Sequence, residues 1–173
     1  MSLVHEAQHF AEEAHASIDQ RRKYSGEPYI VHPRAVAKLV AEHTEDATTI
    51  AAAWLHDVVE DTPVTIEEIA DRFGDDVAGL VRDLTNVSKL SDGNRKTRKA
   101  LDRAHSAKAD LRAKTVKLAD IICNLSDLME QDPAYAQVYV REKELQVQVL
   151  AEEHPDLLKQ ARVLIGKIKS TGS

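Results

Sequence analysis

One stretch indicates both the fold and the chemistry: residues 50–61, which read IAAAWLHDVVED. Its first half is almost entirely apolar, as in a helix buried in a protein core. Its last turn has one histidine and three carboxylates, namely His56, Asp57, Glu60 and Asp61. Spacings of three and four place these side chains on one side of the helix end. Pro63 follows, and the residue before a proline disfavours helical backbone, so we predict a helix over residues 46–61.

The acidic end of this helix is unfavourable in isolation. A helix C-terminus has partial negative charge, so each acid there costs a few tenths to about 1 kcal/mol. No lysine or arginine lies three or four residues from Asp57 or Asp61 to offset the repulsion. A bound divalent cation would remove both costs, whereas the alternative is a solvated acidic helix end. The apolar run before His56 favours the cation, because it indicates that this turn is not fully exposed.

Helical periodicity continues over nearly the whole chain. Proline, glycine and capping residues divide it into expected helices at about residues 3–19, 33–43, 46–61, 65–73, 76–86, 95–106, 109–130, 134–153 and 155–169. No stretch alternates polar and apolar residues as a strand does. We therefore predict an all-α protein, a helical bundle of about eight to ten helices. Residues 1–169 are expected to form a single domain, and residues 170–173 a disordered tail.

Composition restricts the kind of protein. The chain has 173 residues and a formal net charge of −6, which argues against a general nucleic-acid binder. Its one cysteine, Cys123, excludes an intrachain disulfide and a thiolate zinc site, so a metal would need histidine and carboxylate ligands. No segment approaches the ~20 apolar residues of a membrane-spanning helix, and no signal-peptide pattern opens the chain. We expect a cytoplasmic protein that does not bind membranes.

A second stretch, residues 114–128, reads KTVKLADIICNLSDL and is apolar over most of its helical surface. Its polar residues form one stripe at spacings of three and four: Lys117, Asp120, Asn124 and Asp127. A carboxylate in such a helix needs a partner, because an unpaired buried charge is unfavourable. Two interpretations are open. One is a Lys117–Asp120 ion pair with a hydrogen-bonded Asn124, and the other is a metal ligand at Asp120.

The other histidines differ in their setting. His32 lies where a loop meets the next helix, and Pro33 suits the first turn of that helix. Alone, such a histidine is more often a surface residue than a ligand. Three others lie in a mixed polar and apolar helical pattern: His5, His9 and His15. We expect these three at the surface or half-buried, without a metal role.

Together these stretches supply two imidazoles and two carboxylates, from His32, His56, Asp57 and Asp120. Such a set suits Mn²⁺, Fe²⁺, Zn²⁺ or Mg²⁺ and leaves coordination positions for water and substrate. A cation with open positions lowers the pKa of bound water and polarises phosphoryl oxygens. The residues alone thus predict a metal-dependent phosphohydrolase.

Three ordered motifs extend this interpretation: Arg22-Lys23…Gly26-x-Pro28-Tyr29-x-x-His32-Pro33, Leu55-His56-Asp57-x-x-Glu60-Asp61-Thr62 and Val116-Lys117-Leu118-Ala119-Asp120-x-x-x-Asn124. They resemble the motifs of the HD-domain superfamily, which is named for the adjacent histidine and aspartate. The chain is more closely similar to the hydrolase domain of RelA/SpoT proteins and to their single-domain relatives, the small alarmone hydrolases of the metazoan SpoT-homologue type. The likeness extends to about residue 150.

The resemblance implies an HD-domain helical bundle with one Mn²⁺ per chain, bound by His32, His56, Asp57 and Asp120. It implies that Glu60 and Asp61 activate the attacking water. The implied reaction removes the 3′-pyrophosphate of guanosine 3′,5′-bis(diphosphate)-type alarmones, giving GDP (or GTP) and pyrophosphate. The expected partner is therefore a small nucleotide. The oligomeric state stays open, a homo-oligomer included.

The resemblance also indicates which residues meet the substrate. Contacts are expected from Arg22, Lys23, Lys117 and Asn124, with Tyr139 and Lys143 as further candidates. The basic cluster of residues 95–99 is either a solvated helix face or, through Arg95 and Lys96, a grip on the anionic tail of the substrate.

Departures from the family pattern at Ile121 and Cys123 fall on the substrate side and leave the base open. Adenosine-based alarmones, or another 3′- or 2′-phosphorylated nucleotide such as NADPH, are the alternative substrates. A non-enzymatic binding module with a degenerate HD fold is a third interpretation, and the full set of metal ligands argues against it.

Overall fold

The computed structural model describes residues 1–150 and 154–172. Within these ranges the secondary structure consists of ten α-helices, one 3₁₀-helix and an isolated bridge between Arg21 and Pro28, with no strand. The all-α prediction is confirmed. The chain divides into two compact units, Met1–Thr85 and Asn86–Ser173. The expectation of a single domain over residues 1–169 stays a prediction.

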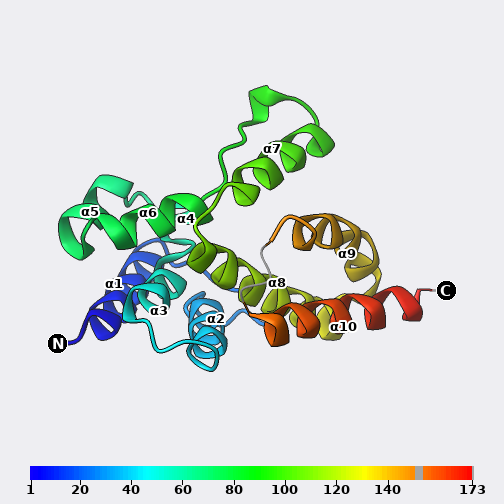
Figure 1. Ribbon diagram of the computed structural model, residues 1–173, viewed down its shortest axis with the longest axis horizontal. Helices are drawn as coiled ribbons and strands as arrows, with labels where there is room; N and C mark the ends of the chain where they lie inside the picture. Colours follow the sequence, from blue (N-terminus) through cyan, green and yellow to red (C-terminus); the bar gives the residue numbers. More distant parts are fainter. Residues whose placement is uncertain (151–153, 173) are drawn as a thin grey trace. The chain divides into compact units, whose positions relative to one another are not determined.

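The first unit contains six helices (Figure 1): α1 (Leu3–Ser17), α2 (Val31–Ala41), α3 (Ala47–Leu55), α4 (Val58–Asp61), α5 (Ile66–Phe73) and α6 (Asp75–Leu84). Helix α3 is central within the unit, because α1, α2 and α6 all pack against it. Its residues 51–53 are alanines with no exposed surface. Their small side chains let three neighbouring helices approach closely, so the apolar run of residues 50–55 lies in the core of this unit.

Side-chain caps start three helices of this unit, α1, α3 and α5. Asp46 accepts a hydrogen bond from the backbone N–H of Thr49 at 3.1 Å, which caps α3. Thr65 and Glu68 form the capping box that the sequence predicts, each side chain accepting from the other residue's backbone N–H. Local sequence therefore determines where these helices begin.

The second unit contains η1 (Leu90–Asp92), α7 (Arg95–Ala107), α8 (Leu111–Gln131), α9 (Pro133–Val147) and α10 (Pro155–Thr171). Helices α8, α9 and α10 pack against one another, and α7 packs against α9. Fully buried side chains on α8 and α10 form the centre of this core: Leu118, Ile121, Leu125, Leu157 and Ile168.

Two predicted helix ends in this unit fall elsewhere. Helix α10 continues to Thr171, so the prediction of a disordered tail from residue 170 is wrong for residues 170 and 171. The side-chain amide of Gln137 on α9 donates to the Ile168 carbonyl and to the Thr171 hydroxyl, which holds this last turn. Helix α9 ends at Val147, and residues 151–153 and 173 lie outside the described residues.

None of the described helices has the length and apolar character needed to cross a membrane.

Two glycines of the first unit give a paired stability prediction. Gly74, between α5 and α6, has φ +90° and ψ 164°, a backbone conformation that side chains disfavour, whereas Gly79 lies inside α6. A Cβ at either position meets nothing within 4 Å, so only backbone preference is tested. We expect Gly74→Ala to lower the free energy of unfolding by about 1–2 kcal/mol and Gly79→Ala to raise it by about 0.5–1 kcal/mol. Urea unfolding measures both, and shifts of the same sign would contradict the assignment.

Candidate functional site

The sequence predicts one continuous helix over residues 46–61, and this prediction is wrong. Helix α3 ends at Leu55 and α4 begins at Val58, so His56 and Asp57 form the junction between two helices. The backbone of Asp57 has φ −104° and ψ −3°, in the sparsely allowed bridge region where many active-site residues lie. Helical periodicity cannot reveal so short an interruption, because the apolar pattern continues on both sides of it.

His56 is oriented by its own helix. Its ring is 2% exposed, and Nδ1 lies 2.7 Å from the carbonyl oxygen of Ala53. A carbonyl oxygen only accepts, so Nδ1 bears the proton and donates, which leaves the lone pair of neutral imidazole on Nε2. That Nε2 lies 3.1 Å from Oδ2 of Asp57. The backbone of α3 thus sets the tautomer that a metal ligand requires.

His32, at the start of α2, lies beside this pair. It is 3% exposed, its Nε2 is 3.8 Å from Oδ2 of Asp57, and its ring meets the His56 ring edge-on at 5.3 Å. One ligand atom from each of His32, His56 and Asp57 lies within 4.8 Å of the others. Within the first unit, the structure therefore brings three of the four predicted metal ligands together.

This donor set fits a divalent cation. Two imidazole nitrogens with lone pairs and one carboxylate oxygen are ligands that Mn²⁺, Fe²⁺ and Zn²⁺ accept. The two histidines are buried and the carboxylate is half-buried, so the ligand atoms converge in a partly desolvated place. The first unit thus has a His/Asp cluster that could hold a divalent metal ion.

Tyr29 is a part of the site to which the sequence analysis gave no role. Its hydroxyl donates to Oδ2 of Asp57 at 2.7 Å, which orients the carboxylate. Its ring also contacts the rings of His15 and His32, at centroid distances of 4.8 and 5.9 Å. The sequence could have indicated this role, because Tyr29 lies three residues before His32 in the same motif, which places both on the turn that begins α2.

The two predicted nucleotide contacts of this unit precede Tyr29. The guanidinium carbon of Arg22 lies 5.6 Å from the centre of the Tyr29 ring, a cation–π distance, so Arg22 borders the cluster. The ammonium of Lys23 instead lies 5.2 Å from the centre of the Tyr24 ring, and both of these side chains are exposed. The loop is closed by a hydrogen bond from the backbone N–H of Arg22 to the carbonyl of Glu27 at 2.8 Å.

The predicted water-activating acids lie on α4. Both the Glu60 and Asp61 side chains are exposed, and Oδ2 of Asp61 accepts a hydrogen bond from the side chain of Gln20 at 3.0 Å. Desolvation and the negative charge of Asp57 raise the pKa of Asp61, while the Gln20 hydrogen bond lowers it.

The expectation for His15 is wrong. It is 1% exposed rather than half-buried or at the surface, and its Nδ1 lies 2.7 Å from Oε1 of Gln20. The polar residues around it in α1 gave no sign of this burial, and two residues that contact its ring, Gln20 and Tyr29, lie in the loop after the helix.

In the second unit, Asp120 on α8 pairs with Lys117 and Asn124, as one of the two interpretations of the sequence predicts. It is 5% exposed, Oδ2 accepts from Lys117 at 3.0 Å, and Oδ1 accepts from Asn124 at 2.9 Å. The charge of this buried carboxylate is therefore compensated within its own helix. A metal role for Asp120 remains a prediction.

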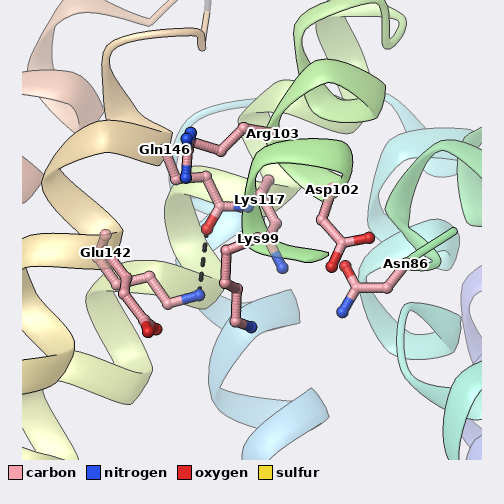
Figure 2. Close-up of a pocket in the computed structure, with 8 residues that line it drawn as sticks. Asn86, Lys99, Asp102, Arg103, Lys117, Glu142 and Gln146 are labelled. Carbon is pink, nitrogen blue, oxygen red and sulfur yellow. Dashed lines mark hydrogen bonds between the residues drawn. The ribbon is translucent and has the colours of Figure 1, made fainter. Parts of the chain in front are cut away.

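A small polar pocket lies in the same unit, among α7, α8 and α9 (Figure 2). Its lining includes four cationic side chains, Lys99, Arg103, Lys117 and Lys143, and the others are Asn86, Asp102, Glu142 and Gln146. Cations outnumber acids, and the carboxylate of Asp102 is already bonded to the backbone N–H groups of residues 87 and 88. The pocket thus has the chemistry of an anion site.

Lys143 is the buried member of this lining. It is 7% exposed, and its ammonium donates to Oε1 of Gln146 at 3.1 Å and lies 4.8 Å from the centre of the Tyr139 ring. Burial, together with the positive charge of Lys117, lowers the pKa of Lys143 to about 7. Near pH 7 this buried amine is only partly charged, and an anion bound beside it would favour its ammonium form.

Arg95 and Lys96, on the first turn of α7, are exposed. The guanidinium of Arg95 forms a two-pronged ion pair with Glu142 on α9, at 2.6 and 3.0 Å. Of the predicted substrate contacts in this unit, only Lys117 and Lys143 line the pocket, whereas Asn124, Tyr139, Arg95 and Lys96 do not.

Comparison with known proteins agrees with these observations. The chain matches the HD domain family over residues 7–152. It is 41% identical over 135 residues to guanosine-3′,5′-bis(diphosphate) 3′-pyrophosphohydrolase MESH1 of Xenopus tropicalis, an alignment that covers 76% of this chain and 73% of that protein. It is 42% identical over 136 residues to a probable guanosine-3′,5′-bis(diphosphate) 3′-pyrophosphohydrolase of Synechocystis sp., covering 77% of this chain but only 18% of that longer protein.

Solved structures extend the comparison to the fold. The structure described as "A metazoan ortholog of SpoT hydrolyzes ppGpp and plays a role in starvation responses" is 30% identical, with a TM-score of 0.86 over 98% of this chain and 97% of that one. A crystal structure from Listeria monocytogenes is 25% identical, with a TM-score of 0.67 over 83% of this chain and 99% of that one. The resemblance drawn from the motifs is thereby confirmed, and this chain belongs to the HD domain family.

Proposed function

We propose that this chain hydrolyses guanosine 3′,5′-bis(diphosphate)-type alarmones, releasing the 3′-pyrophosphate and leaving GDP (or GTP). The observation that supports it most strongly is the oriented His32, His56 and Asp57 cluster in a chain that aligns with 73% of a relative named for this reaction. The bacterial relatives extend far beyond the aligned part, so their other activities have no bearing on this proposal.

We propose Mn²⁺, one ion per chain, as the cation, with Asp120 as the fourth ligand beside the three of the first unit. A cation held there would lower the pKa of bound water and polarise a phosphoryl oxygen. Two observations support Asp120 as the fourth ligand. Its carboxylate is buried, and it lies in the third sequence motif. Lys117 and Asn124 would then orient the Asp120 carboxylate from the second unit.

The proposed mechanism is a single displacement at phosphorus. The water oxygen attacks the phosphorus attached to the ribose 3′ oxygen, the bond between that phosphorus and oxygen breaks, and the leaving 3′ oxygen takes up a proton from solvent to become the 3′ hydroxyl. Asp61, with Glu60 beside it, accepts the proton of the attacking water. Tyr29 holds Asp57 in place, and Arg22 and Lys23 contact the nucleotide.

The basic pocket is the proposed site for a substrate phosphate. Lys143 and Lys117 would bind its oxygens, with Asn124 and Tyr139 as nearby contacts. Arg95 and Lys96 would contact the substrate from the first turn of α7. The guanidinium of Arg95 would release Glu142 and bind phosphate instead, because it binds carboxylate and phosphate in the same two-pronged geometry.

A substrate panel with Mn²⁺ tests the proposal. Purified protein is incubated with guanosine and adenosine 3′,5′-bis(diphosphates) and with NADPH, and the products are identified by chromatography and by separate assays for pyrophosphate and phosphate. We expect pyrophosphate from the guanosine compound and no turnover with EDTA. If pyrophosphate comes only from the adenosine compound, or inorganic phosphate from NADPH, that compound replaces the guanosine alarmone as the assigned substrate. No product at all would overturn the enzymatic assignment.

We further propose a cytoplasmic enzyme whose partner is this small nucleotide. The net charge of −6 supports the exclusion of nucleic acid as a general ligand.

A further inference from the structure

Three side chains of the first unit form a hydrogen-bonded series that ends on Asp61. Nδ1 of His15, on α1, lies 2.7 Å from Oε1 of Gln20, and Nε2 of Gln20 donates to Oδ2 of Asp61 at 3.0 Å. A carboxylate only accepts, so the Gln20 amide must turn its NH₂ toward Asp61 and its oxygen toward His15. Nδ1 of His15 is therefore the protonated nitrogen. The direction of every hydrogen bond in the series is determined.

A histidine at position 15 is unfavourable for the stability of the fold. It is 1% exposed, and its Nε2 is buried with no hydrogen-bond partner among the described residues. Such an unsatisfied buried nitrogen costs the fold, and burial also lowers the pKa of His15, which keeps the ring neutral near pH 7. An apolar ring would fill the same space against Tyr29 without this cost. What histidine adds is the Nδ1–H that Gln20 accepts.

The backbone around Gln20 is held as firmly as its side chain. Asp19, two residues after the end of α1, has φ +49°, a left-handed conformation that glycine usually supplies. The N–H of Asp19 donates to the carbonyl of Ala16 at 3.0 Å, and the N–H of Gln20 donates to that of His15 at 3.1 Å. The carbonyl of Gln20 then accepts from the N–H of Tyr29 at 2.9 Å. Gln20 is thus fixed between the end of α1 and the tyrosine that orients Asp57.

Asp61 needs such a restraint. Its side chain reaches the surface, and α4 is only four residues long, so a long helix does not restrict its rotamers. We propose that Gln20, locked by His15, is a positioning residue that holds the Asp61 carboxylate in the orientation for accepting the proton of the attacking water. This inference rests on the proposed function, and it assigns to His15 and Gln20 a role through Asp61 rather than contact with the substrate.

The test compares two glutamines that each donate to a carboxylate. Gln20→Met keeps the length of the side chain and removes both hydrogen bonds. Gln8→Met is the matched control, because Gln8 donates to Glu12 on α1 at 3.2 Å, away from the cluster. In alarmone hydrolysis we expect Gln20→Met to lower kcat about 10- to 100-fold with KM changed less than about twofold, and Gln8→Met to leave both within about twofold.

Two variants of His15 separate positioning from packing. His15→Phe keeps the ring against Tyr29 and loses the donor, whereas His15→Asn places an amide NH₂ close to where Nδ1 was. We expect kcat to fall about 10-fold in His15→Phe and to recover most of that loss in His15→Asn, although the smaller side chain packs worse. The reverse order would show that the ring matters only for packing, and would overturn the inference.

A spectroscopic readout is independent of turnover and of metal. In ¹⁵N NMR of the metal-free protein, His15 should be the Nδ1–H tautomer, and Gln20→Met should remove that preference. An Nε2–H tautomer in the wild-type protein contradicts the hydrogen-bonded series. Wild-type turnover that Gln20→Met leaves unchanged contradicts the positioning role alone, whereas absence of turnover in the wild-type protein contradicts the proposed function from which that role is drawn.

Discussion

Asp57→Ala is expected to lower the rate of alarmone hydrolysis by about 10³-fold or more, equivalent to about 4 kcal/mol of transition-state stabilisation. Asp57 supplies the only carboxylate of the first-unit cluster, with the Nε2 atoms of His56 and His32 at 3.1 and 3.8 Å from its Oδ2. Without it, the first unit supplies only two imidazoles and the proposed ligand set keeps one carboxylate in place of two, so a divalent cation is held more weakly. The loss should therefore appear in metal binding as well as in turnover.

The control for this variant is Asp71→Ala, which removes an exposed carboxylate from α5 in the same unit. We expect Asp71→Ala to keep wild-type turnover and Mn²⁺ affinity, and both variants to keep the helical circular dichroism of the wild-type protein. Mn²⁺ binding is measured by electron paramagnetic resonance. An Asp57→Ala protein that still binds Mn²⁺ with wild-type affinity and turns over alarmone would exclude the cluster as the metal site.

Lys143→Met is expected to stabilise the protein while weakening substrate binding. The buried ammonium of Lys143 has a pKa of about 7 in the folded chain, against an ordinary value of 10.5. Because the folded pKa is the lower one, the cost of burying the charge is full below pH 7 and diminishes as the pH rises from 7 toward 10.5. Removing the charge should therefore raise the free energy of unfolding by about 2–4 kcal/mol at pH 6 and by less at pH 9.

Binding should change in the opposite direction. An ammonium bonded to phosphate contributes about 1.5–3 kcal/mol, so KM for the alarmone should rise about 10- to 100-fold in Lys143→Met at pH 6. Wild-type KM should also rise as the pH passes 7, and the variant should lack that dependence. Lys167→Met, an exposed change on α10, is the control for stability and KM. A Lys143→Met protein that is less stable at pH 6, with unchanged KM, would disprove the anion site.

Much of the fold was predictable because its determinants are local. The Thr65 and Glu68 capping box, the proline-marked starts of α9 and α10, and the alanine-rich core of α3 each depend on residues within one or two helical turns. The Lys117, Asp120 and Asn124 contacts were predictable for the same reason, since spacings of three and four place side chains next to one another on a helix.

Where prediction was wrong, distant residues decided the outcome. His15 was expected at the surface or half-buried, yet it is 1% exposed, the Tyr29 ring contacts its ring, and Gln20 binds it. The helix over residues 46–61 was expected to be continuous, yet it breaks at His56 and Asp57, where the two side chains converge with His32 from another helix. Neither event leaves a periodic signal in the sequence.

The order of amino acids by itself determined that this protein is all-helical, that it belongs with HD-domain proteins, and that histidine and carboxylate residues are the available metal ligands. Only the tertiary structure decided the convergence of His32 with His56 and Asp57, the orientation of Asp57 by Tyr29, the restraint of Asp61 by Gln20, and the burial of Lys143 in a basic pocket. The physical reason is the distance along the chain between the residues that come into contact. Helical spacing determines contacts within a few residues, whereas a hydrogen bond between residues 20 and 61 exists only after separate elements have packed together.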